Sequence, residues 1–112
     1  MRTERIASLL EKELSLIISQ ELKDPRVGLI TVTKVNIKPD LKNAVVYFST
    51  MGDKKNDLNT LQHAKGFIKA VLAQRVRMKF IPEIEFRLDE SFEYGQKMEK
   101  LFKQLSKDNQ EK

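Results

Sequence analysis

Two stretches of the chain carry apolar side chains at three- and four-residue steps, the period of an amphipathic α-helix. Thr3 can cap the first helix, and Asn56 or Asp57 can cap the second. The apolar positions of the first are Ile6, Leu9, Leu10, Leu14, Ile17, Ile18 and Leu22. Those of the second are Leu58, Leu61, Ala64, Ile68, Val71 and Leu72. Pro25 ends the first helix, because proline cannot continue the helical hydrogen-bond ladder.

Three other segments are predicted to be β-strands, and two of them, 29–37 and 83–88, show the alternating pattern typical of such strands. Residues 29–37 place one set of side chains on one face, Leu29, Thr31, Thr33, Val35 and Ile37, and a second set on the other, Ile30, Val32, Lys34 and Asn36. Residues 39–43 supply turn chemistry before a second strand at 44–49, which predicts an antiparallel hairpin. Pro82 precedes a third strand at 83–88, in which apolar and charged residues alternate.

The second helix is not expected to be straight. Gly66 interrupts it at a cost of roughly 1 kcal/mol relative to alanine, which suggests a kink or a close backbone approach. An unbroken helix would also bring Arg75 into the apolar stripe, which favours a bend or an end before it. A short helix can follow over residues 91–105, and residues 106–112 are polar and predicted to be a disordered tail. These elements predict one α+β domain, residues 1–105, with helices on one face of a three-stranded sheet.

Charge along the chain indicates a class of partner. The 112 residues carry a net charge of +5. Residues 58–82 hold no acidic residue and five basic ones, Lys65, Lys69, Arg75, Arg77 and Lys79, so the excess is local. Such a segment attracts phosphate, which favours nucleic acid. The alternative interpretation is an ordinary solvated helix face. Binding to an anionic membrane is a weaker hypothesis, because the apolar residues of this segment are needed for the core.

Several kinds of chemistry are not expected. The chain has no cysteine and one histidine, His63, which excludes disulfides and cysteine or multi-histidine metal sites. Glu83 and Glu85 share one side of a strand, but solvated carboxylates are the simpler interpretation. No phosphate-binding glycine loop or nucleophile motif is present. With no secretory signal or apolar run long enough for a membrane span, we expect a cytoplasmic protein without cofactor, metal or small-molecule substrate.

The aromatic residues bear on how RNA would be recognised. Three fit apolar stripes and are expected in the core, namely Phe48, Phe86 and Phe102. Five remain unassigned, namely Tyr47, Phe67, Phe80, Phe92 and Tyr94. Without an evident platform for base stacking, the pattern favours recognition of folded RNA through phosphates, shape and 2′-hydroxyls.

Six segments together resemble the bacterial ribosome-binding factor A family. They are ELKDPR at 21–26, TVTKV at 31–35, DLKNA at 40–44, AKGFI at 64–68, RMKFIPEIEF at 77–86 and DES at 89–91. The resemblance covers about residues 2–105 in the family's order. It implies a type II KH-like domain, in which an alanine-x-glycine kink, here Ala64 and Gly66, replaces the G-x-x-G clamp of ordinary KH domains.

The resemblance also implies a function. It is that of a non-catalytic assembly factor that binds the free 30S small ribosomal subunit, assists late 16S rRNA processing and maturation near the 5′ end, and is important in the cold. The expected RNA-binding residues are Lys65, Gly66, Lys69, Arg75, Arg77 and Lys79. Additional candidate contacts are Arg26, Lys34, Lys38 and Lys42, for which ordinary solvated side chains are the alternative. A protein-interaction module that docks an acidic partner remains the second hypothesis, and the free protein is expected to be a monomer.

Overall fold

The computed structural model describes residues 2–22, 29–91, 99 and 101–103. The elements follow one another as α1 (Arg2–Leu16), a π-helical turn η1 (Ile17–Glu21), β1 (Ile30–Ile37), β2 (Asn43–Thr50), α2 (Lys54–His63), α3 (Lys65–Arg75) and β3 (Glu83–Leu88). This order confirms the predicted α+β domain with its helix, strand, strand, helix, helix, strand sequence. The segment at 24–26, most of the predicted C-terminal helix and the tail at 106–112 lie outside the described residues.

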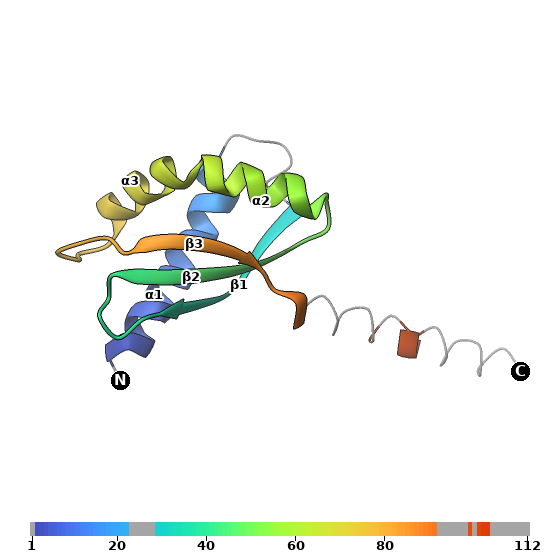
Figure 1. The fold of residues 1–112 in the computed structure, drawn as a ribbon, viewed down its shortest axis with the longest axis horizontal. Helices are drawn as coiled ribbons and strands as arrows, with labels where there is room; N and C mark the ends of the chain where they lie inside the picture. Colours follow the sequence, from blue (N-terminus) through green and yellow to red (C-terminus); the bar gives the residue numbers. More distant parts are fainter. Residues whose placement is uncertain (1, 23–28, 92–98, 100, 104–112) are drawn as a thin grey trace, which may run out of the picture.

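The three strands form one sheet in the order β1-β2-β3. β1 and β2 pair antiparallel, as the predicted hairpin requires, and β2 and β3 pair parallel. Figure 1 shows the parallel connection, in which the chain leaves β2, passes through α2 and α3 and returns along β3. Among the described elements, α1, α2 and α3 lie on one side of the sheet (Figure 1), and exposed polar side chains such as those of Lys34, Glu85 and Arg87 lie on its other face.

A β-bulge in β1 corrects the predicted alternation of that strand. The register shifts between Val32 and Lys34, so that Thr33 is an extra residue opposite β2. Because of this one-residue shift, four apolar side chains that a regular strand would divide between two faces are all buried, namely Ile30, Val32, Val35 and Ile37. The Thr33 hydroxyl donates a hydrogen bond of 2.6 Å to Asp89 Oδ2, just beyond β3.

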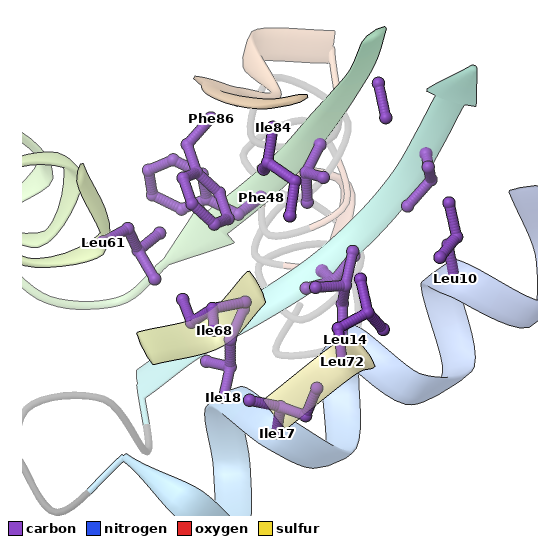
Figure 2. Close-up of a cluster of buried hydrophobic side chains, with 14 of the residues drawn as sticks. Leu10, Leu14, Ile17, Ile18, Phe48, Leu61, Ile68, Leu72, Ile84 and Phe86 are labelled. Atoms are coloured by element: carbon purple, nitrogen blue, oxygen red, sulfur yellow. The ribbon is translucent and has the colours of Figure 1, made fainter. Parts of the chain in front are cut away.

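The core lies between the sheet and the helices. Figure 2 shows Leu10 and Leu14 of α1 and Ile17 and Ile18 of η1 facing the sheet, which contributes Phe48, Ile84 and Phe86. Leu61 of α2 and Ile68 and Leu72 of α3 complete this part of the core. Phe48 and Phe86 are buried, as predicted. The prediction for Phe102 is wrong, since 62% of this residue is exposed. By the end of β3 the helices already cover the sheet face, which leaves no core position for it.

Helix boundaries differ from the predictions at both N-termini. α1 begins at Arg2, so Thr3 lies inside the helix. α2 begins at Lys54, and its cap is Asp53, whose Oδ1 accepts a hydrogen bond from the backbone N–H of Asn56. Asp57, one of the two predicted caps, is instead 2% exposed and accepts a hydrogen bond from the Thr50 hydroxyl. Capping residues were misplaced because Asp53 and Asp57 are chemically alike and lie one helical turn apart.

Candidate nucleic-acid interface

The helix pair α2 and α3 breaks at a single residue. Ala64 has φ −84° and ψ 0°, its N–H donates to the Thr60 carbonyl and its own carbonyl accepts from Ile68. Gly66 is exposed on the first turn of α3, and a Cβ added there would meet nothing within 4 Å among the described residues. The expected break is therefore present, but the fold itself does not require glycine at 66. The open surface at Gly66 gives an outside molecule close access to the backbone.

Lys65 and Lys69 lie one helical turn apart beside this break. Lys69 Nζ lies 2.6 Å from Glu83 Oε1, at the start of β3. The hydrogen bond and positive charge of Lys69, together with the charge of Lys65, hold the pKa of the Glu83 carboxyl below its ordinary value. We call Ala64, Lys65, Gly66 and Lys69 the kink surface. One of its two cations is therefore already partly neutralised by an acidic side chain.

Arg75 forms ion pairs with two carboxylates of the N-terminal helical segment. Its guanidinium lies 2.9 Å from Glu21 Oε1 in η1 and 3.4 Å from Glu13 Oε2 in α1. α3 runs as far as Arg75 and ends there, with Val76 as an extended C-cap. Of the two predicted alternatives, a bend or an end before Arg75, the break at Ala64 supplies the bend. These contacts connect the end of α3 to the first helix. Arg75 thus helps to hold α3 against α1 and η1, a role that its position in the basic segment of the sequence does not indicate.

Arg77 and Lys79 lie on the segment between α3 and β3, where they border a hollow of about 490 Å³. Its other walls come from the first turns of α1 and from the turn between β1 and β2. The basic residues around it are Arg2, Arg5, Lys42, Arg77 and Lys79, and Asp40 is its one acidic residue. Its apolar residues are Ile6, Leu9, Leu41, Met78 and Phe80. We call this site the basic hollow.

The remaining candidates are spread over the surface. Lys34 is exposed on β1 opposite Tyr47, on the polar side of the sheet, and Lys38 is exposed at the start of the β1–β2 turn. Lys42 lies at the end of that turn and lines the basic hollow, whereas Arg26 lies outside the described residues. The structure therefore brings Lys42 together with Arg77 and Lys79, places Lys65 beside Lys69, and leaves Lys34 apart.

Sequence reasoning missed Arg2 and Arg5. Their three-residue spacing puts both on one face of a helix, which was visible in the sequence. Nothing in the sequence placed that face against residues 77–80, and the N-terminal acids concealed the local charge. The sequence pattern also left Phe80 unassigned. In the structure this ring is 74% exposed, and Lys79 Nζ lies 5.7 Å from its centroid.

The described residues offer little else that resembles a reaction centre. Among them, no three His, Cys, Asp or Glu side chains gather as metal ligands. His63 is exposed, and its Nδ1 lies 2.8 Å from the Asn59 carbonyl one turn earlier in α2. Within the same part of the chain, no helix combines the length and apolarity needed to cross a membrane.

The element order, the sheet pairing and the helix pair broken at Ala64 define a type II KH-like α+β domain, which carries basic side chains at the kink surface and at the basic hollow. A family model described as ribosome-binding factor A matches residues 2–102. Ribosome-binding factor A of Staphylococcus carnosus is 44% identical over 110 residues, covering 96% of each chain. That of Macrococcus caseolyticus is 41% identical over 111 residues, covering 96% of this chain and 97% of the relative. The chain belongs to the ribosome-binding factor A family.

Solved structures agree with this assignment. The crystal structure of ribosome-binding factor A from Thermus thermophilus has a TM-score of 0.73 at 32% identity, over 77% of this chain and 93% of that one. A homology model of the Thermus thermophilus factor was fitted into the cryo-EM map of its 30S complex. It has a TM-score of 0.66 at 33% identity and covers 75% of this chain and 91% of that one. The fold is thus shared with a factor that has been placed on the 30S particle.

Proposed function

We propose that this protein is an assembly factor that binds the free 30S ribosomal subunit through its 16S rRNA and assists late processing and maturation near the 5′ end of that RNA. Its role is binding and not catalysis, it acts as a monomer in the cytoplasm, and it matters most in the cold. Family membership and the 30S complex of the Thermus thermophilus relative support this proposal.

The observation that carries it is a division among the cations. Lys69 and Arg75 form ion pairs within the fold, whereas Lys65, Arg77 and Lys79 form none with a carboxylate among the described residues. Unpaired cations on a surface attract polyanions, and binding to phosphates releases counterions. The kink surface and the basic hollow are therefore the surfaces we assign to ribosomal RNA.

Co-sedimentation with free small subunits, large subunits and joined ribosomes across a salt series tests the proposal. The wild-type protein should bind the free small subunit selectively, and its affinity should fall steeply with salt. Joint replacement of Lys65, Lys69, Arg77 and Lys79 by glutamine should abolish this binding while the protein stays folded. Replacing Lys12, Lys54, Lys55 and Arg87 by glutamine removes the same charge from other exposed positions and should have a much smaller effect.

Two outcomes would contradict the proposal. Equal binding by the two quadruple variants would show that total charge matters and the assigned surfaces do not. Binding that survives nuclease treatment of the subunit would instead indicate an acidic protein partner, which is the second hypothesis that the sequence left open.

A further inference from the structure

The basic hollow has an apolar floor that the fold leaves uncovered. Phe80 is 74% exposed and Leu9 is 42% exposed, although Leu9 belongs to the apolar stripe of α1. Both residues line the hollow, which is formed by three segments distant in the sequence that meet at one end of the molecule (Figure 1). Its volume of about 490 Å³ falls within the range of roughly 300–1,000 Å³ typical of ligand pockets. The hollow is large enough for a small planar group.

The rim of the hollow is strongly cationic. None of its five basic side chains, Arg2, Arg5, Lys42, Arg77 and Lys79, forms an ion pair with a carboxylate among the residues that the structure describes. The one acidic residue, Asp40, is engaged by the turn, since its Oδ1 accepts a hydrogen bond of 2.9 Å from the Lys42 N–H. The site therefore favours an anionic occupant that also brings apolar surface.

Phe80 specifies the shape of that surface. An exposed phenyl ring stacks on any nucleobase, and each such stack contributes substantially to binding of single strands. Lys79 Nζ lies over the same ring, 5.7 Å from its centroid, and this flexible side chain can move from the ring to a phosphate next to the stacked base. Base stacking and phosphate binding are thus available within one site. A flat membrane surface or a base-paired duplex would not make both of these contacts at once.

We propose that the basic hollow binds one unstacked nucleotide of single-stranded RNA. Its base stacks on Phe80 against the apolar floor, and its flanking phosphates lie among Arg77, Lys79 and the arginines of α1. This inference rests on the proposed function and adds to it a contact with a base, whereas the exposed lysines alone indicate recognition of phosphates. It places this contact apart from the kink between α2 and α3.

Fluorescence anisotropy with two labelled probes tests the proposal. One probe is a short oligouridylate, whose bases stack weakly on one another, and the other is a duplex of oligoadenylate and oligouridylate. Phe80→Ala and Phe80→Leu should each weaken oligouridylate binding by roughly tenfold and leave duplex binding unchanged. Phe80→Trp should keep oligouridylate binding near the wild-type level, because it retains an aromatic ring. Arg77→Gln should weaken binding of both probes. Met51→Ala, at an apolar residue that is 84% exposed elsewhere, is the control for lost apolar surface.

The outcomes separate this inference from the proposed function. Equal oligouridylate binding by wild type and Phe80→Ala would overturn the nucleotide site, even if the wild type co-sediments with free small subunits. Loss of oligouridylate binding in Phe80→Ala without any wild-type co-sedimentation would contradict the proposed function and support the nucleotide site. Competition by polyglutamate as effective as that by unlabelled oligouridylate would overturn the site in favour of an acidic protein segment.

Discussion

Lys69 Nζ on α3 and Glu83 Oε1 on β3 lie 2.6 Å apart, joining the helix next to the kink to the edge strand of the sheet. Glu83 is well exposed, so water screens this pair and its effect on stability is small. Its effect on binding is larger, because phosphate and Glu83 compete for the same ammonium group. Glu83 therefore limits the positive potential of the kink surface.

Replacing Glu83 by glutamine should strengthen binding to the free small subunit. The variant releases Lys69 for one further phosphate contact, which should raise affinity by roughly two- to fivefold near physiological salt and make the salt dependence steeper. Sedimentation binding curves at several salt concentrations measure both quantities. Glu85→Gln is the matched control, since Glu85 lies two residues along β3 and pairs with Arg87 on the polar side of the sheet. Equal gains in the two variants would point to overall charge and away from the kink surface.

The same pair predicts how stability depends on pH. Lys69 holds the pKa of Glu83 below its ordinary value of 4.5, so the folded state keeps this carboxylate charged at pH values where the unfolded chain begins to protonate it. The pair should contribute fully above pH 4.5, and its contribution should disappear as the pH falls through the lowered pKa. Thermal unfolding of wild type and Glu83→Gln from about pH 7 to about pH 3 measures this. A difference in Tm that persists unchanged at the acid end of that range would contradict it.

The fold was predictable to the extent that periodicity determines it. The strands, the helix pair and most of the core follow from spacing, because burial of one face requires it. The bulge at Thr33 was visible as a change of phase, since Ile30 and Val32 are followed by Val35 and Ile37. A regular strand without the bulge, as predicted from alternation alone, would place these four side chains on two faces. The π-helical turn Ile17–Glu21 left no such signal, since its i to i+5 hydrogen bond depends on tertiary packing.

The candidate site was less predictable, because a cation's availability depends on neighbours that are distant along the chain. Arg75 and Arg77 are two residues apart and chemically identical. The structure pairs Arg75 with Glu13 and Glu21, at separations of 62 and 54 residues, and sets Arg77 at the basic hollow. Composition alone gives both residues equal weight as RNA contacts.

This contrast predicts different effects for two matched variants. Arg75→Gln should lower the free energy of unfolding by up to about 1 kcal/mol, because the ion pairs that connect α3 to α1 and η1 are partly exposed, and it should change subunit affinity little. Arg77→Gln should leave stability unchanged and lower subunit affinity and its salt dependence. Urea unfolding and co-sedimentation on both variants provide the comparison. If Arg75→Gln lost more affinity for the subunit than Arg77→Gln, Arg75 and not Arg77 would be the RNA contact.

A partly buried polar cluster at the start of α2, formed by Thr50, Gly52 and Asp57, is the basis of another prediction. The Gly52 N–H donates to Thr50 Oγ1, and the Thr50 hydroxyl donates to Asp57 Oδ2, a carboxylate that is 2% exposed. Thr50→Val keeps the side-chain shape but deprives Asp57 of this donor, which should lower the free energy of unfolding by about 1–3 kcal/mol. Thr50→Ser keeps the hydroxyl and should lose less, and urea unfolding of both measures the difference. Wild-type stability in Thr50→Val, together with a loss in Thr50→Ser, would show that the methyl group, and not the hydrogen bond, holds α2 against the sheet.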